Sequence, residues 1–313
     1  MSAAERLTTC VYIASPSFSG STLLAMLMAG HPSIATIGEM KGGQEDLETY
    51  TCSCGALFAK CPFWTWLIGA LAERGFVYDL SDRRTMPAFR IPGDPIADRV
   101  MRRAYGGPTS EVLRSLVLHC WPSCSRRLEH LRRYNETFIQ LVRQFYGASV
   151  VLDSSKDPVR IKYLAGIPSL NLHAIHLIRD CRGVVNSARK NLGMSAREAS
   201  IEWRETHLEI ERVTHRFCPG RVLRVKYEDL CTNVDSVLAS IFAFFGVSGR
   251  VTAPAAAKRQ MHVLGNRARL NGLLPIRHDE SWRHEMPQRD LATFASLAGL
   301  LSDRYGYEAT RDP

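Results

Sequence analysis

Four short apolar segments constrain the fold of this chain more strongly than any other feature of its sequence. They span residues 7–15, 148–153, 171–178 and 221–227, and each is followed by polar turn residues and then by a segment of helical length. Strands that alternate with helices pair in parallel and need helical cover. We therefore predict an α/β fold, a doubly wound parallel sheet with helices on both faces.

Two later segments carry signals of helix ends. Ser195 and Glu198 have the spacing of a capping box, which predicts that a long helix starts there. Asn233 can cap an apolar helix that Gly246 stops. The second helix follows the strand predicted at 221–227, and the first lies in the interval between two predicted strands.

The turn after the first strand has the composition of a phosphate-binding loop. In a parallel sheet this turn lies at the carboxyl end of the strand, where backbone N–H groups and a helix N-terminus converge on an anion. The loop contains no lysine, which disfavours the ATP or GTP chemistry of a Gly-Lys-Ser/Thr loop. A plain turn with a threonine at the helix start is the alternative. The candidate phosphate-binding residues are Ser17, Phe18, Ser19, Gly20, Ser21 and Thr22.

A second candidate anion site follows the third predicted strand. Arg179 lies at the end of that strand, and Ser187 follows eight residues later on the next predicted helix. A guanidinium fork and a hydroxyl can hold one phosphate from two sides. The two sites together predict a ligand that is phosphorylated at both ends.

This combination resembles the sulfotransferases that use 3′-phosphoadenosine 5′-phosphosulfate (PAPS), here as a bacterial member. That family binds the 5′-phosphosulfate in a Pro-Lys/Arg-Ser-Gly-Ser/Thr-Thr loop and the 3′-phosphate with an arginine and a serine eight residues apart. Its Tyr-Glu-Asp-Leu segment matches Tyr227 and the three residues after it, and its basic C-terminal segment matches Arg267 and Arg269. The resemblance runs from about Val11 to Trp282. It implies a P-loop-like fold, PAPS as co-substrate and transfer of a sulfuryl group to a hydroxyl of a small molecule, glycan or lipid.

One position departs from that family pattern. Phe18 stands where the family has a cation that touches the transferring group. The tyrosylprotein branch carries a catalytic lysine in a Lys-Asp-Pro segment and a glutamate base after a His-Pro pair. By resemblance, these roles fall on Lys156 and on Glu39, which follows the His31-Pro32 pair. An ordinary exposed lysine and a carboxylate that caps a neighbouring helix are the alternatives.

The expected mechanism is an in-line displacement in which positioning and electrostatic stabilisation provide most of the rate. The resemblance requires no metal. Because Phe18 replaces the usual cation, a non-catalytic nucleotide-binding or regulatory protein is the second hypothesis. A divergent P-loop kinase is a third, which the missing loop lysine disfavours.

Three closely spaced cysteines, Cys52, Cys54 and Cys61, suggest a zinc site but fit it poorly. Structural zinc takes four ligands, and a fourth would have to come from a distant part of the chain. The resemblance implies packing or a local disulfide instead. The chain has nine cysteines, an odd number, so reduced thiols are expected overall.

Much of the net charge of +9 lies between residues 83 and 133, where eleven arginines face four acids. This segment predicts an anionic partner, although arginine stems on a solvated helical face give the same pattern. The segment has few aromatics, so nucleic acid is disfavoured. Pro87 to Pro108 is rich in proline, glycine and charge, which predicts a loop or lid. We expect a single domain over 1–313, with 80–133 inserted as an arginine-rich substrate lid.

The apolar stretches are shorter than the ~20 residues that a membrane span needs, and the first residues lack the apolar core of a signal peptide. The sequence therefore predicts no integral membrane segment and a cytoplasmic location. It does not indicate the oligomeric state.

Overall fold

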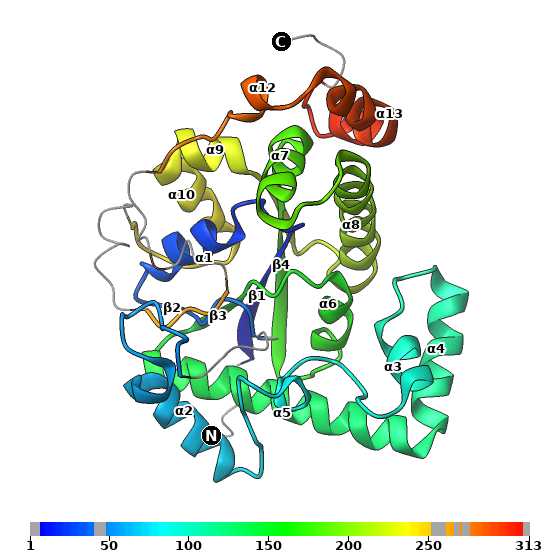
Figure 1. Cartoon of the computed structure of the whole chain (residues 1–313). Coiled ribbons are helices and arrows are strands. Elements are labelled where there is room, and N and C mark those ends of the chain that lie inside the picture. The colour runs from blue at the N-terminus through cyan, green and yellow to red at the C-terminus, as the bar shows by residue number, and fades with distance from the viewer. Residues whose placement is uncertain (1–6, 41–47, 252–260, 266–269, 271–275, 309–313) are drawn as a thin grey trace.

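The computed structural model describes residues 7–40, 48–251, 261–265, 270 and 276–308, and it contains the expected alternation of strands and helices (Figure 1). Five strands form one sheet in the order β2-β3-β1-β4-β5, and every neighbouring pair is parallel. The predicted fold class is confirmed. The strands are β1 (Thr8–Ala14), β2 (Ile34–Thr36), β3 (Val150–Asp153), β4 (Leu170–Ile178) and β5 (Val222–Lys226).

The strand order creates a switch point between β1 and β4. The chain leaves β1 towards β2 on one side, whereas it leaves β4 towards β5 on the other. In open α/β sheets, ligands bind outside the carboxyl ends of the strands at such a point. The loops that begin at Ser15 and at Arg179 therefore flank the expected binding edge.

Alternate residues of β1 face two separate hydrophobic cores. Cys10 and Tyr12 face one core, and Val11 and Ile13 face the other. The first core packs against α2 (Pro62–Ala72), α5 (Pro122–Tyr146), α6 (Pro158–Leu164) and α8 (Ala196–Phe217), and the second against α1 (Ser21–Ala29), α9 (Tyr227–Thr232) and α10 (Val234–Phe244). Figure 1 shows α1, α9 and α10 on one side of β1 and β4, and α6 and α8 on the other.

A third core lies outside the sheet. It joins α7 (Cys181–Leu192) and the start of α8 to α12 (Trp282–Glu285) and α13 (Gln288–Arg304). The predicted capping box of α8 is confirmed, since Ser195 and Glu198 bond reciprocally. At α10 the expectation is only partly right: Asn233 occupies the N-cap position, but its side chain makes no capping bond.

The segment predicted as a loop or lid is partly helical, which corrects that expectation. Residues 80–133 contain the short 3₁₀ helix η2 (Arg83–Thr85), α3 (Pro95–Arg102), α4 (Pro108–Cys120) and the first part of α5. Asp94 caps α3 by accepting a hydrogen bond from the N–H of Ala97 at 2.9 Å. Figure 1 shows α3 and α4 on the far side of α6 from β2 and α1. Across the residues described, no helix combines the length and apolarity needed to cross a bilayer.

Candidate active site

The loops after β1 and β4 contact each other at the switch point. The Nη1 of Arg179 donates a hydrogen bond to the carbonyl oxygen of Phe18 at 2.8 Å. The Arg179 guanidinium carbon lies 4.5 Å from the centre of the Tyr227 ring, at the start of α9. Three of the residues predicted to bind the nucleotide therefore lie side by side, as the two-site interpretation requires.

The backbone of the first loop approaches Tyr227 closely at Gly20. Gly20 has a φ of +86°, and a Cβ there would lie 2.4 Å from Cδ2 of Tyr227. Only glycine fits this combination of conformation and close contact. The glycine therefore lets the loop turn tightly into α1, whose first residue is Ser21.

Two hydroxyls of the same loop are buried without a hydrogen-bond partner among the residues described. They belong to Ser15 and Ser19, and both side chains are fully buried. Buried polar groups are normally paired, so an unpaired one needs an explanation. An anion at the N-terminus of α1 would supply acceptors near this turn.

The second predicted anion site holds internal partners. The Nη2 of Arg179 donates to the Asp279 carboxylate at 3.1 Å. Although burial would raise the pKa of Asp279, hydrogen bonds from Ser281 and the charge of Arg179 hold it below its usual value. Ser187 donates its hydroxyl proton to the Gly183 carbonyl, one turn back on α7, at 2.8 Å. Binding of a phosphate by Arg179 and Ser187 stays a prediction.

The two residues predicted to be catalytic form an ion pair. The Nζ of Lys156 lies 2.7 Å from Oε1 of Glu39, and both side chains are largely buried. Glu39 follows β2 and Lys156 follows β3, so both lie beyond the carboxyl ends of neighbouring strands. The sheet thus brings together a carboxylate and an ammonium from positions more than a hundred residues apart.

Backbone hydrogen bonds fix the segment that carries Glu39. The N–H of Ser154 donates to the Gly38 carbonyl at 3.0 Å, and the N–H of Met40 donates to the Ser155 hydroxyl at 2.9 Å. A parallel bridge joins Gly38 to Leu264 on the other side. Glu39 is therefore held between the loop after β3 and the segment 261–265.

Both non-glycine residues with positive φ among the described residues belong to the candidate site. Phe18 has a φ of +62° and Lys156 a φ of +58°. The left-handed region costs a side-chain-bearing residue on the order of 1–2 kcal/mol. Such strain gathers at functional sites, because the surrounding structure must hold it in place.

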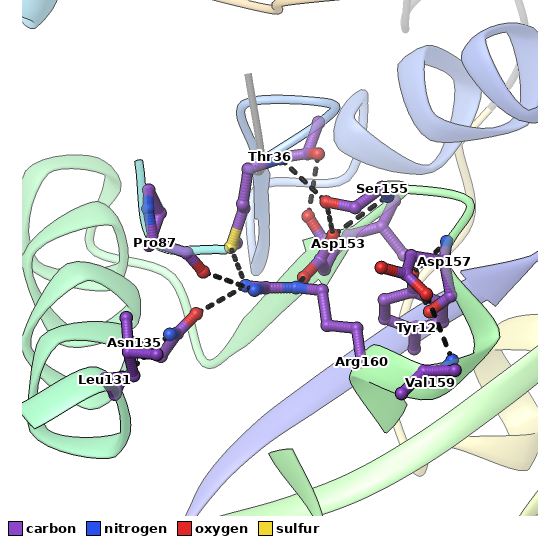
Figure 2. A network of polar contacts seen from close by, with 12 residues as sticks. Tyr12, Thr36, Pro87, Leu131, Asn135, Asp153, Ser155, Asp157, Val159 and Arg160 are labelled. Atoms are coloured by element: carbon purple, nitrogen blue, oxygen red, sulfur yellow. Dashed lines mark hydrogen bonds and ion pairs between the residues drawn. The ribbon is translucent and has the colours of Figure 1, made fainter. Parts of the chain in front are cut away.

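A buried ionic network supports the loop that carries Lys156 (Figure 2). The Nε of Arg160 donates to the Asp153 carboxylate at 2.7 Å, and the pair is almost completely buried. Asp153 also accepts hydrogen bonds from the N–H and hydroxyl of Ser155, at 2.9 and 2.5 Å. The loop is therefore tied at its first residues to the end of β3 and, through Arg160, to α6.

Tyr12 fixes the other end of this loop. Its hydroxyl donates to the Asp157 carbonyl and accepts from the Asp157 N–H, both at 2.8 Å. Burial, together with the charge of Asp153, holds the pKa of Tyr12 well above its usual value, so the phenol stays protonated. Lys156 lies between these two attachments.

Residues 80–133, predicted as an inserted lid, contact the network around Arg160 at Pro87. The Pro87 carbonyl accepts a hydrogen bond from Arg160 at 2.5 Å (Figure 2). Two arginines of residues 80–133 have acidic partners within the same segment: Arg90 pairs with Asp98 at 2.7 Å, and Arg114 pairs with Glu111 at 2.9 Å. Contact between this segment and an acceptor stays a prediction.

A fourth candidate ligand joins the three cysteines, and it comes from a distant part of the chain, as the sequence required. The imidazole of His262 lies beside them, with Nδ1 at 3.1 Å from Sγ of Cys61 and 3.6 Å from Sγ of Cys52. A local disulfide is not formed, since Cys54 and Cys61 have their sulfurs 3.7 Å apart. Folding brings His262 across about two hundred residues, a distance that sequence spacing does not reveal.

Sequence reasoning also missed Asp279 and Arg160. Arg160 had a usable signal, because it lies in the first turn of the helix that follows a strand ending in an aspartate. Asp279 and His262 had none, since their segments contain no strand or helix pattern to place them. Two predicted residues, Arg267 and Arg269, lie outside the described residues.

The chain has a P-loop-like α/β fold with the candidate anion-binding loops at one edge of its sheet. A sequence model of the Sulfotransferase family matches residues 111–250, which include Lys156, Arg179, Ser187 and Tyr227. Over these residues the chain is similar to the sulfotransferase family.

Two curated sulfotransferases are similar to the chain in sequence, and a solved structure is similar in fold. Carbohydrate sulfotransferase 5 of Mus musculus is 25% identical over 223 residues, which is 61% of this chain and 54% of the relative. Carbohydrate sulfotransferase 6 of Homo sapiens is 26% identical over 221 residues, 60% of this chain and 53% of the relative. The chain thus spans about half the length of these relatives. The sulfotransferase domain from the curacin biosynthetic pathway shares the fold, with a TM-score of 0.50, 17% identity, and coverage of 97% of this chain and 99% of that domain.

Proposed function

We propose that this chain is a sulfotransferase that moves the sulfuryl group of PAPS to a hydroxyl acceptor, with Glu39 as the general base. The ion pair between Glu39 and Lys156 carries the proposal, because it lies beyond the carboxyl ends of β2 and β3 in a chain similar to this family. The donor is the usual one for the family. The names of both curated relatives favour a sugar hydroxyl among the possible acceptors.

The donor would be held at its two charged ends. The 5′ end would bind the loop from Ser17 to Thr22 and the N-terminus of α1, where the buried hydroxyl of Ser19 needs a partner. The 3′-phosphate would bind Arg179 and Ser187, and would have to displace the carboxylate of Asp279 from Arg179. The family pattern also assigns Tyr227, Arg267 and Arg269 to this site, and the two arginines lie outside the described residues.

In the transfer step, the acceptor oxygen forms a bond to sulfur while the bond from sulfur to the bridging phosphate oxygen breaks. Glu39 takes the acceptor proton as its hydroxyl attacks. Lys156 stabilises the negative charge that develops on the bridging oxygen, together with the N–H groups of the first loop. Because Lys156 contacts Glu39 directly, its ammonium can orient the base and can also offset the charge of the leaving group.

Phe18 supports the assignment of this role to Lys156. Its side chain packs against the third core, with α7 and α8, while its carbonyl contacts Arg179. No ammonium is therefore available from that position, and Lys156 is the candidate that meets Glu39. The competing function is a protein that binds the nucleotide without turnover.

Transfer of radiolabelled sulfate from PAPS to a panel of hydroxyl acceptors tests the proposal. Wild type should label at least one acceptor. Glu39→Gln should slow turnover about 10²- to 10⁴-fold, because the amide cannot take the proton. Lys156→Ala should also lose turnover, and both variants should still be stabilised by 3′,5′-bisphosphoadenosine in a thermal-shift assay.

Glu205→Gln is the matched control, since Glu205 forms a surface ion pair with Arg204 on α8. This variant should keep full turnover. Nucleotide binding without labelling of any acceptor would favour the non-catalytic function. Unchanged turnover in Glu39→Gln would reject Glu39 as the base.

A further inference from the structure

Four metal-binding side chains converge at a place that the proposed reaction does not use. Cys52 and Cys54 precede the 3₁₀ helix η1 (Phe58–Lys60), Cys61 follows it, and His262 comes from the segment 261–265. One ligand atom from each residue lies within 4.8 Å of the other three. Cys52 and Cys61 are fully buried and His262 is 5% exposed, so the group is closed to bulk solvent on most sides.

The distances fit a tetrahedral metal site. With zinc–sulfur bonds of 2.3 Å and a zinc–nitrogen bond of about 2.05 Å, tetrahedral angles place two sulfurs about 3.8 Å apart and a sulfur and a nitrogen about 3.6 Å apart. The Cys54 and Cys61 sulfurs lie 3.7 Å apart, and Sγ of Cys52 lies 3.6 Å from Nδ1 of His262. The 3.1 Å contact between Cys61 and His262 is shorter than a tetrahedral edge.

The surrounding backbone holds the ligands in place. Residues 51–57 form a tight hairpin in which the N–H of Cys52 donates to the Ala56 carbonyl at 2.9 Å, and Gly55 turns the chain with a φ of +91°. Ser53 clamps the histidine segment: its hydroxyl donates to the Met261 carbonyl at 2.8 Å and accepts from the Val263 N–H at 2.7 Å. Both neighbours of His262 are therefore fixed.

Two further contacts prepare individual ligands. The ring of Phe63 stacks on the imidazole of His262, with centroids 5.0 Å apart and an angle of 12° between the planes. Cys61 occupies the N-cap position of α2, so the start of that helix fixes its backbone. The imidazole ring and one of the sulfurs are therefore held in place by their own neighbours.

We infer that Cys52, Cys54, Cys61 and His262 bind one structural Zn²⁺ ion. Three sulfurs and one nitrogen in tetrahedral arrangement favour zinc over the oxygen-loving divalent ions. Four protein ligands leave no open position for a substrate, so the ion stabilises the fold rather than taking part in chemistry.

The site has a defined structural task. His262 lies two residues before Leu264, whose N–H donates to the Ile37 carbonyl at 2.6 Å, and three before Gly265, which packs against Glu39. Zinc would therefore fasten the segment that covers the Glu39 side of the sheet edge. This role does not depend on which acceptor or donor the chain uses.

Metal analysis of the purified chain tests the inference without any turnover measurement. Chain expressed with zinc and purified without chelator should contain about one zinc per chain by elemental mass spectrometry. His262→Ala and Cys52→Ser should lose at least nine-tenths of it, whereas His262→Cys should retain it as a four-cysteine site. Cys124→Ser is the control, because Cys124 is equally buried but lies outside the cluster.

Two measurements on wild type keep the inference falsifiable if a variant fails to fold. Chelator treatment should lower the melting temperature and expose three extra thiols, and Co²⁺ added afterwards should give the visible absorption of a tetrahedral thiolate site. Less than a tenth of a zinc per chain, iron in place of zinc, or a disulfide between two of these cysteines would overturn the assignment. Retention of zinc by His262→Ala would do so too.

Discussion

Replacing Arg160 by methionine removes the central side chain of the buried network in Figure 2. Its guanidinium donates to Asp153 at 2.7 Å, to the Pro87 carbonyl at 2.5 Å and to the Asn135 side-chain oxygen at 2.6 Å. All three acceptors would lose a charged donor in a site that water does not reach. The Asp153 carboxylate, which is fully buried, would also lose its counter-charge.

The size of the loss follows from this geometry. Removing one partner of a buried ion pair costs about 3–5 kcal/mol, because the remaining charge stays buried and unpaired. Removing both charges, in Asp153→Asn with Arg160→Met, should cost roughly 1–2 kcal/mol, since no unpaired charge remains. At roughly 2 °C per kcal/mol for a chain of this size, the single variant should melt about 6–10 °C lower.

Urea unfolding at pH 7 of wild type, both single variants and the double variant measures these values. Arg126→Met is the control, because Arg126 is exposed on α5 and bonds only its own helix at 3.2 Å; it should change stability by less than about 0.5 kcal/mol. A loss below about 1 kcal/mol for Arg160→Met, or additive losses in the double variant, would refute the reasoning from unpaired charge.

Three further predictions concern other parts of the site and core. Lys156→Gly should have a free energy of unfolding about 1 kcal/mol higher than Lys156→Ala, because only glycine adopts a φ of +58° without strain. Both variants should lose turnover. Equal stability of the two variants in denaturant would contradict the prediction. Asp279→Asn should tighten the binding of 3′,5′-bisphosphoadenosine about fivefold, measured by calorimetry, because the Asp279 carboxylate no longer competes with the phosphate for Arg179. Weaker binding by this variant would show that no such competition exists. His176 and His207 contact each other at 2.7 Å, and burial lowers the pKa of His176 to about 3 and that of His207 well below its usual value. The unfolded chain therefore binds protons before the folded chain does as the pH falls below about 6.5. His176 alone should lower the free energy of unfolding, measured in urea, by about 2 kcal/mol between pH 7 and pH 5. His176→Gln should reduce this pH dependence, and a wild type that is equally stable at both pH values would disprove the prediction.

Local signals were sufficient to predict the sheet and several helix ends. The capping box at the start of α8 depends on Ser195 and Glu198, which are three positions apart, and such local contacts form in the same way in any fold. By contrast, α3 is eight residues long and lies in a segment rich in proline and glycine. Its helix depends on the Asp94 cap and on the pairing of Asp98 with Arg90, which sequence periodicity does not reveal.

The candidate site also has parts that local sequence signals predict and parts that they do not. The loop from Ser17 to Thr22 and the position of Arg179 could be predicted, because turns after parallel strands share one edge of the sheet. The pairing of Glu39 with Lys156 came only through resemblance to a family, since nothing local links residues 117 positions apart. His262 and Asp279 depend on the path of the C-terminal segments over that edge, which no pattern in the sequence describes.

The bridge between Gly38 and Leu264 has a consequence for biosynthesis. All five strands have been translated once Lys226 has been added, so the nascent chain can complete its sheet while the residues around Leu264 are still inside the ribosome. The edge that carries Glu39 gains its outer neighbour only when those residues emerge. The chain can therefore form its sheet first and complete the surroundings of Glu39 last.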